Sequence, residues 1–329
     1  MTEPRFDVVG IGNAIVDVLA QTEDDFLASH DLNKGTMTLI DADTAGKLYD
    51  DMGPAIECSG GSAANSIACL ASLGGKGAFI GKVRDDQLGE AFRHDIQTLG
   101  VAFDTPFAKD GVSTARCLIF VTPDAQRTMQ TFLGACVELG PDDVDEGVIA
   151  DAQVTYLEGY LWDPPKAKEA FVKAAKLAHD ADRQVSLSLS DPFCVGRHRA
   201  EFLDLVNDHV DILFANEEEI LSLYEVDDFD AAMQKVRGHC KIAALTRGPK
   251  GSVVISGDEV HVIDPEPATP VDTTGAGDGY AGGFLYGLTQ GFDLAKSARI
   301  GGIVASQVIG HVGARPDIPL KNIVEKALS

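Results

Sequence analysis

The sequence predicts an α/β protein built on a doubly wound, mostly parallel β-sheet with helices on both faces, together with a second, small β layer. From residue 144 onward, apolar strand-like runs alternate with helical segments, which is typical of a parallel sheet. The run at 6–11 is almost continuously apolar, as expected for a central strand buried on both faces. The small layer is predicted by β-branched runs at 14–20 and 35–40 and by a hairpin-like pair of runs within 114–133.

The composition is that of an ordinary globular protein with a large excess of acidic residues. Its 329 residues, 45% of them apolar, are enough for one large α/β domain or two smaller ones. The 27 basic and 51 acidic residues give a net charge of −24, which disfavours nucleic acid or an anionic membrane as a partner. The N-terminus is unlike a signal peptide and no apolar run is long enough to span a membrane, so we expect a cytoplasmic protein.

The expected elements follow in chain order. The first half should hold a short helix at 23–30, a helix after the glycine turn at 60–61, and strands at 114–121 and 127–133 joined by a turn at 122–126. The second half should hold helices at 142–150, 165–180 and between 189 and 211, and strands at 154–157, 185–189, 211–214, 242–246 and 252–255. Ligands of such sheets bind at the carboxyl ends of the parallel strands, so the polar segments found there are candidates for a site.

The loop at 272–278, Asp-Thr-Thr-Gly-Ala-Gly-Asp, is the strongest functional signal. Prolines within 265–270 keep its approach irregular, whereas apolar residues recur every four positions from 280 to 288, so a helix should begin near Gly275. The N-terminus of a helix exposes unpaired N–H groups and a partial positive charge. Small residues there allow a phosphate to approach the backbone.

Asp278 is an acid in the first turn of that helix, where it would repel a bound phosphate unless it takes part in chemistry. Phosphoryl transfer to an alcohol fits: Asp278 takes the hydroxyl proton, while the N–H groups of Gly275, Ala276 and Gly277 stabilise charge on the migrating phosphoryl group. The alternative is structural, because an acid in a first turn is often a partner of the helix dipole and glycines often cap helices.

This loop resembles the second signature of the ribokinase-type (PfkB) family of carbohydrate and nucleoside kinases. Gly-Gly-Ser-Ala-Ala-Asn at 60–65, with Gly-Lys-Val-Arg-Asp-Asp-Gln-Leu-Gly at 81–89, resembles the first signature. The resemblance implies a single ribokinase-like α/β domain over residues 1–329, with a discontinuous β lid from about 14–40 and 100–133. It also implies an enzyme that uses ATP and Mg²⁺, with Asp278 as the catalytic base.

The same resemblance suggests which residues bind the acceptor. Asp17 lies among valines, where a carboxylate is costly unless it is hydrogen-bonded. Solvent at an exposed strand end would supply those hydrogen bonds, and so would two neighbouring hydroxyls of a sugar. In the family that the chain resembles, the matching acid binds the hydroxyls of the acceptor. By family position, the Asn65 amide is expected to bind the acceptor, and Gly60 and Gly61 are expected to lie directly beneath the sugar. The alternative for the glycines is that they allow close packing of a helix.

The nucleotide side is implied by the resemblance in the same way. Asn216 and Glu219 match the family's N-x-x-E, which orders Mg²⁺ largely through water, although they also read as a simple helix cap. Arg127 matches a position that clamps phosphates, and the alternative is a solvated arginine of a hairpin. Near the nucleotide, by family position, lie Thr246, Gly248 and Gly251.

The acceptor is the least determined feature. Tyr160 and Phe193 each follow the carboxyl end of a strand and, with Met129, match apolar positions of nucleoside kinases in the family. This match favours adenosine as the acceptor, phosphorylated on its 5′-hydroxyl to give AMP. The alternative is that the two rings pack beneath loops. A free-sugar kinase acting on ribose or fructose, and a sensor without turnover, are the other readings. We expect ATP and a nucleoside or sugar as partners, a monovalent cation such as K⁺ as an additional cofactor in some members, and a monomer or a lid-mediated homodimer.

Overall fold

The computed structural model describes residues 3–124 and 126–329, in which the strands form two sheets. Ala125, part of the turn expected at 122–126, and the first two residues lie outside the described part. The large sheet has the strand order β13-β12-β11-β10-β9-β8-β1-β5. Its strands are β1 (Phe6–Ile11), β5 (Gly77–Ile80), β8 (Ala152–Glu158), β9 (Gln184–Ser188), β10 (Ile212–Asn216), β11 (Ile242–Thr246), β12 (Ser252–Ser256) and β13 (Glu259–Ile263).

Six neighbouring strands are parallel, namely β5, β1, β8, β9, β10 and β11. Strands β12 and β13 continue the sheet in antiparallel fashion beyond β11. Every residue of β1 is buried, as its apolar run predicts. Side chains alternate between the faces: in β10, Leu213 and Ala215 pack in one core and Ile212 and Phe214 in the other. The prediction of a mostly parallel sheet buried on both faces is therefore confirmed.

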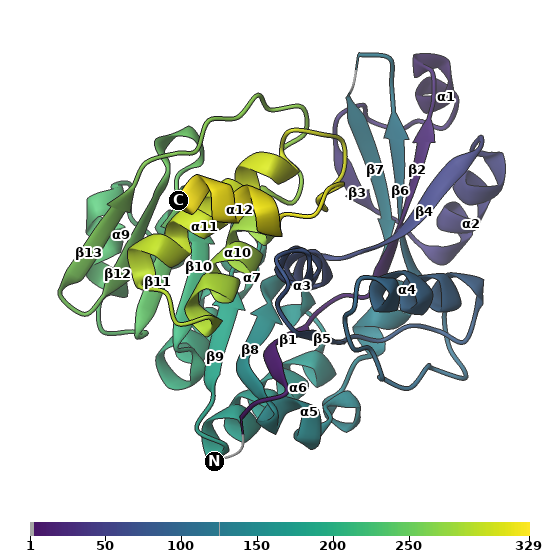
Figure 1. Cartoon of the computed structure of the whole chain (residues 1–329). Helices are drawn as coiled ribbons and strands as arrows, with labels where there is room; N and C mark the ends of the chain where they lie inside the picture. Colours follow the sequence, from purple (N-terminus) through teal and green to yellow (C-terminus); the bar gives the residue numbers. More distant parts are fainter. Residues whose placement is uncertain (1–2, 125) are drawn as a thin grey trace.

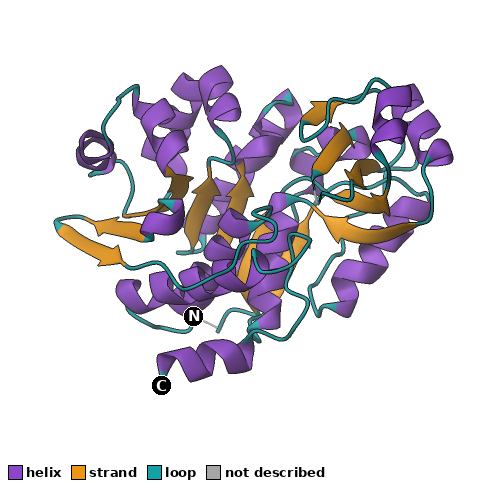
Figure 2. Cartoon of the chain, turned by 90° about the horizontal axis from the view of Figure 1, so that it is seen from above, coloured by secondary structure: helices purple, strands orange, loops and turns teal. Residues whose placement is uncertain are grey.

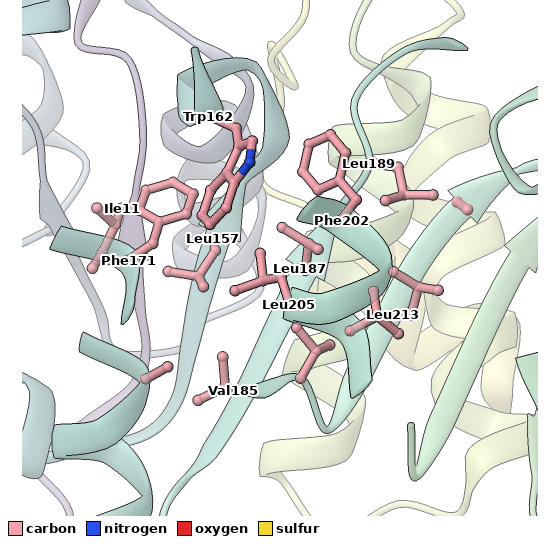
Figure 3. Packing of buried hydrophobic residues seen from close by; sticks show 14 of the residues in the cluster. Ile11, Leu157, Trp162, Phe171, Val185, Leu187, Leu189, Phe202, Leu205 and Leu213 are labelled. Carbon is pink, nitrogen blue, oxygen red and sulfur yellow. The ribbon is translucent and has the colours of Figure 1, made fainter. Parts of the chain in front are cut away.

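Helices cover both faces of this sheet (Figures 1 and 2). Those that pack in the first core, around Phe171 and Phe202 in Figure 3, are α5 (Glu146–Ala150), α6 (Pro165–Asp180), α7 (Pro192–His209), α8 (Glu217–Tyr224) and α9 (Phe229–Val236). The second core is formed with α3 (Ser62–Ser72), α4 (Gln87–Thr98), α10 (Ala276–Thr289) and α11 (Leu294–Val308). The C-terminal helix α12 (Lys321–Leu328) packs on α11. Among the described helices, none combines the length and apolar character that crossing a membrane requires.

The small sheet lies beside the large one, on the right in Figure 1, and has the order β3-β7-β6-β2-β4. Its strands are β2 (Ile15–Gln21), β3 (Met37–Leu39), β4 (Ala55–Gly60), β6 (Ala115–Val121) and β7 (Arg127–Phe132), and it is flanked by α1 (Asp24–Ser29) and α2 (Ala42–Asp51). The expected hairpin, β6 with β7, is present. Strand β4 was not expected, because its short and partly polar sequence lacks a clear alternation and is held by its antiparallel pairing with β2.

One predicted helix is shorter than expected. Residues 142–150 do not form a continuous helix: a 3₁₀ turn, Pro141–Asp143, is followed by α5, which begins only after Asp145. The Asp145 side chain accepts hydrogen bonds from the N–H groups of Gly147 and Val148 and so defines the start of α5. The long helix expected at 165–180 has the predicted bounds.

Helix α10 approaches α3 so closely that there is no room for a side chain between them. A Cβ at Gly282 would collide with the carbonyl oxygen of Ser66. On the other side of α10, a Cβ at Gly283 would lie 2.9 Å from the Cα of Gly301 in α11. The small residues that follow Asp278 in the sequence therefore serve the packing of three helices.

We expect Gly282→Ala to lower the free energy of unfolding by about 1–3 kcal/mol, because the new methyl group must push α3 and α10 apart. Gly196 in α7 is a matched control, since it is exposed and a Cβ there meets no atom within 4 Å. Gly196→Ala should raise stability by roughly 0.5–1 kcal/mol through helix propensity. Denaturant unfolding measures both, and equal effects of the two variants would contradict the close-packing argument.

Candidate active site

The loop before α10 has the form expected of an anion site. Gly275 is the N-cap of α10 with φ +77°, and a Cβ there would lie 2.6 Å from the carbonyl oxygen of Ala314, so glycine is required. The N–H of Ala276 already donates to the carbonyl of Thr273 at 3.2 Å. Of the three N–H groups expected to face a phosphoryl group, those of Gly275 and Gly277 have no such acceptor within the described chain and are available to donate.

Asp278 is held by two side chains from the first turn of α3. The Ser62 hydroxyl donates to its Oδ1 at 2.6 Å and the Asn65 amide to its Oδ2 at 3.2 Å. Burial raises the pKa of Asp278, while these two hydrogen bonds and the charge of Arg315 act in the opposite direction. The carboxylate is thus oriented by donors and made more basic by its environment, which suits a proton acceptor.

Sequence reasoning missed Ser62. Its signal lies in the spacing, because residues three apart on a helix share one face, so the serine of Gly-Gly-Ser-Ala-Ala-Asn must point the same way as Asn65. Glu158, at the end of β8, was missed too. It is buried and accepts hydrogen bonds from the Asn13 amide at 2.7 Å and the Ala63 N–H at 2.8 Å, and burial raises its pKa to about 7.

Asp17 lies on β2 opposite Cys58, and the glycine turn leaves space for its carboxylate. A Cβ at Gly60 would collide with that carboxylate, and Gly61, at φ +94°, has the Asn13 carbonyl where a side chain would be. Burial raises the pKa of Asp17 to about 6, with Arg315 and Arg127 lowering it and Asp278 raising it. Among the described residues, none donates a hydrogen bond to this carboxylate, so both of its oxygens are available to accept hydrogen bonds from a ligand.

The aromatic candidates are on the surface and not beneath loops. Phe193, in the first turn of α7, is 81% exposed and Tyr160 is 41% exposed. They follow the ends of the neighbouring strands β8 and β9. The Ser190 hydroxyl accepts from the Tyr160 N–H at 3.0 Å, and the φ of Ser190, +73°, is unusual for a residue with a side chain. Met129 is half-buried on β7, between Ile119 and Met37 of the neighbouring strands.

Asn216 and Glu219 form a capping box at the start of α8. The Asn216 N–H and Nδ2 donate to the Glu219 carboxylate at 2.9 and 2.6 Å, and the Glu219 N–H donates to Asn216 Oδ1 at 2.8 Å. Burial, together with the charges of Asp191, Glu218 and Asp278, raises the pKa of Glu219 to about 7. In the described part of the chain, no group of three or more His, Cys, Asp or Glu side chains is placed to hold a metal ion, so a Mg²⁺ beside Asn216 and Glu219 would be held largely through water.

The acidic run around α8 is partly neutralised. Arg247 makes a two-point contact with the Glu217 carboxylate, at 2.9 and 3.3 Å, and Lys250 contacts it at 3.3 Å. Thr246 is paired in register with Asn216, so β10 and β11 place the two candidate segments side by side. Gly248 has open space around it, whereas a Cβ at Gly251 would collide with the Ile263 carbonyl.

Arg127 contacts the loop before α10 from the small sheet. Its Nη1 lies 2.7 Å from Oδ2 of Asp272, and both side chains are more than 90% buried. Asp272 also accepts from the N–H groups of Thr274 at 3.1 Å and Gly313 at 2.9 Å. Arg127 is therefore not a solvated hairpin residue, and its side chain is adjacent to the stretch expected to bind phosphates.

Known proteins match this chain over most of its length. A family model described as pfkB family carbohydrate kinase matches residues 57–321. The chain is 28% identical to an adenosine kinase of Saccharomyces cerevisiae, over 98% of this chain and 99% of that protein. Two crystal structures align with 98% of this chain over 99% of their own length. One is adenosine kinase from Sinorhizobium meliloti, 51% identical with a TM-score of 0.90. The other is a probable sugar kinase protein from Rhizobium etli CFN 42, 50% identical with a TM-score of 0.91.

The predicted ribokinase-like fold, with a mostly parallel sheet and a second small sheet, is confirmed by these structures. Relatives of both kinds, nucleoside and sugar kinases, transfer a phosphoryl group to an alcohol, and the family uses ATP. The chain accordingly belongs to the pfkB family of carbohydrate and nucleoside kinases and is a phosphotransferase with an alcohol group as acceptor.

Proposed function

We propose that the protein is an adenosine kinase that transfers the terminal phosphoryl group of ATP to the 5′-hydroxyl of adenosine. The observation that carries this choice is the pair of exposed rings, Tyr160 and Phe193, which follow the carboxyl ends of the neighbouring strands β8 and β9. A purine binds largely by stacking on flat apolar surfaces, whereas a free sugar needs a pocket of hydrogen-bonding groups. The Sinorhizobium adenosine kinase at 51% identity supports the same choice.

In the proposed reaction the 5′-hydroxyl oxygen forms a bond to the terminal phosphorus of ATP while the bond from that phosphorus to the leaving ADP oxygen breaks. Asp278 takes the hydroxyl proton, and Ser62 and Asn65 hold its carboxylate in place. The free N–H groups of Gly275 and Gly277 stabilise negative charge on the phosphoryl oxygens. Asp17, with unfilled acceptor sites, binds the ribose hydroxyls.

Asn216 and Glu219 would hold Mg²⁺, largely through water. The bound ion would neutralise charge on the ATP phosphates. Thr246, Gly248 and Gly251 border the nucleotide, with the open backbone at Gly248 allowing close approach. We propose that the small sheet acts as a lid within a single domain, and that Arg127, which pairs with Asp272 in this structure, contacts the phosphates as the lid closes.

A free-sugar kinase is the second candidate, supported by the probable sugar kinase from Rhizobium etli at 50% identity. The two proposals differ in one measurement. Purified enzyme with Mg-ATP should give a higher kcat/KM with adenosine than with ribose or fructose. The opposite order would replace the first proposal with the second.

Asp278→Asn should keep the fold and ATP binding but lose turnover by roughly 10²- to 10⁴-fold, because a positioned base is removed. Steady-state ADP release and calorimetric ATP binding measure the two effects. Asp293→Asn is a matched control: Asp293 caps α11 through the Lys296 N–H, and asparagine caps helices equally well. An Asp278→Asn enzyme with near wild-type kcat would contradict the mechanism.

Glu219→Gln should raise the Mg²⁺ concentration needed for half-maximal rate, because ordering of metal-bound water weakens. Asp17→Asn should instead raise the KM for the acceptor. Glu218→Gln, at an exposed position beside Glu219, is the control for a change of charge alone. If Glu219→Gln and Asp17→Asn shifted the same parameter, the proposed separation of donor and acceptor sites would be wrong.

Tyr160→Ala should weaken adenosine use by about 1–3 kcal/mol in kcat/KM, the scale of one lost base stack. Tyr160→Phe keeps the ring and should stay close to wild type. Any turnover of ribose should be unchanged in both variants. A loss that is equal for adenosine and ribose would show that Tyr160 supports the loop and does not stack on a base.

A further inference from the structure

The side chain of Arg315 lies beside the candidate site and comes from a loop to which the sequence analysis assigned no function. This loop lies between α11 and α12 and is fastened to the loop before α10 at two points: the Gly313 N–H donates to Asp272 at 2.9 Å, and Ala314 packs where a side chain of Gly275 would be. The next residue is Arg315, whose side chain is only 15% exposed.

The guanidinium of Arg315 joins three other segments. Its Nε donates to Asn65 Oδ1 on α3 at 2.9 Å, and its Nη1 lies 3.3 Å from Asp95 Oδ2 on α4. Nη1 also donates to the Ser59 hydroxyl on β4, and the Ser59 N–H donates to the same Asp95 oxygen at 2.7 Å. The fork of a guanidinium can make these contacts simultaneously, whereas an ammonium group cannot.

These contacts decide which way the Asn65 amide faces. An amide has an acceptor end and a donor end, and a guanidinium can only donate, so Arg315 holds the Asn65 oxygen on its own side. The Asn65 NH₂ is thereby turned to Asp278, 3.2 Å away. In the flipped orientation the amide oxygen would face the carboxylate and repel it.

Arg315 also supplies positive charge in a strongly acidic region. The charge of Asp278 raises the pKa of three other acids, Asp17, Glu158 and Glu219. The charge of Arg315 lowers the pKa of Asp278, and it lowers the pKa of Asp17 more than the charge of Arg127 does. Burial lowers the pKa of Arg315 itself, but a guanidinium stays charged in proteins.

We propose that Arg315 is a positioning residue of the phosphoryl-acceptor site, which orients the Asn65 amide toward Asp278 and places a buried positive charge beside both Asp278 and Asp17. This inference rests on the proposed role of Asp278 as the base. It gives Arg315 two separable effects, one geometric and one electrostatic. Replacement by lysine retains the charge and loses the fork, and replacement by methionine loses both.

The test is the pH dependence of adenosine phosphorylation with Mg-ATP in Arg315→Lys and Arg315→Met. Asp17, with a pKa of about 6, and Asp278, with a raised pKa, must be ionised, so kcat/KM should fall as the pH decreases through that region. In Arg315→Met this acid limb should move up by about one pH unit, because the charge that favours both carboxylates is gone. In Arg315→Lys the limb should stay near its wild-type position, while kcat falls roughly tenfold through misorientation of Asn65.

A double-mutant cycle tests whether Arg315 acts through Asn65. Once Asn65→Ala has removed the amide, Arg315→Lys should cause no further loss of kcat. Independent, additive losses would overturn the proposal, as would an unshifted acid limb in Arg315→Met. If Arg315→Met fails to fold, the cycle with Arg315→Lys still decides.

Two controls separate this inference from the proposed function. Arg299→Met changes an exposed arginine on α11 that pairs with Glu266, outside the site, and should leave kcat and the pH profile unchanged. Asp278→Asn is measured in parallel. Retained activity in Asp278→Asn would defeat the proposed function, whereas an inactive Asp278→Asn with additive effects of Arg315 and Asn65 would defeat only the role of Arg315.

Discussion

The candidate site depends on the close approach of α3 and α10. Both helices begin at a glycine with positive φ, Gly61 and Gly275, and their backbones come together where Gly282 meets the carbonyl of Ser66. Only at this separation can Ser62 and Asn65 reach Asp278. Two N-terminal ends with partial positive charge thus converge on the space where, in our proposal, the phosphoryl group passes to the acceptor.

The electrostatics of the site follow from the same crowding. A chain with a net charge of −24 gathers Asp17, Glu158, Glu219 and Asp278 in one region, and burial raises the pKa of each of them. Buried acids of this kind are costly unless donors or cations face them. Helix ends, amides and a few buried arginines provide that compensation locally, which reconciles an acidic protein with a substrate that is itself an anion.

The small sheet is joined to the site by polar contacts and not only by packing. Arg127 on β7 pairs with Asp272 next to the loop of Asp278, and Ser59 on β4 accepts from Arg315, which holds Asn65. Asp17 on β2 lies between these contacts. A movement of the small sheet would therefore displace these contacts and shift side chains of the proposed acceptor site. The proposed lid is in this way connected to the catalytic residues by polar contacts.

Much of the fold could be predicted because periodicity is a local property. The short apolar runs at 154–157, 185–189 and 242–246 alternate with helical segments along the chain, which identifies them as parallel strands. The helix at 165–180 is predicted by the spacing of its apolar residues. Strand β4 and the short α5 could not be identified in this way, because the first is held by pairing with β2 and the second begins where the Asp145 cap places it. Non-local pairing and capping are not visible in a hydrophobic pattern.

The sequence by itself determined the glycine-rich turns, the starts of α3 and α10, and the candidate acids Asp17 and Asp278, because each is recognised from neighbours within a few residues. The tertiary structure alone decided what meets Asp278: Ser62 lies 216 residues away in the chain, and Arg315 lies 250 residues from the Asn65 amide that it orients. It also decided that Tyr160 and Phe193 are exposed. The physical reason is that burial, pKa and hydrogen-bond partners depend on which distant segments the packing of α3, α10 and the two sheets brings together.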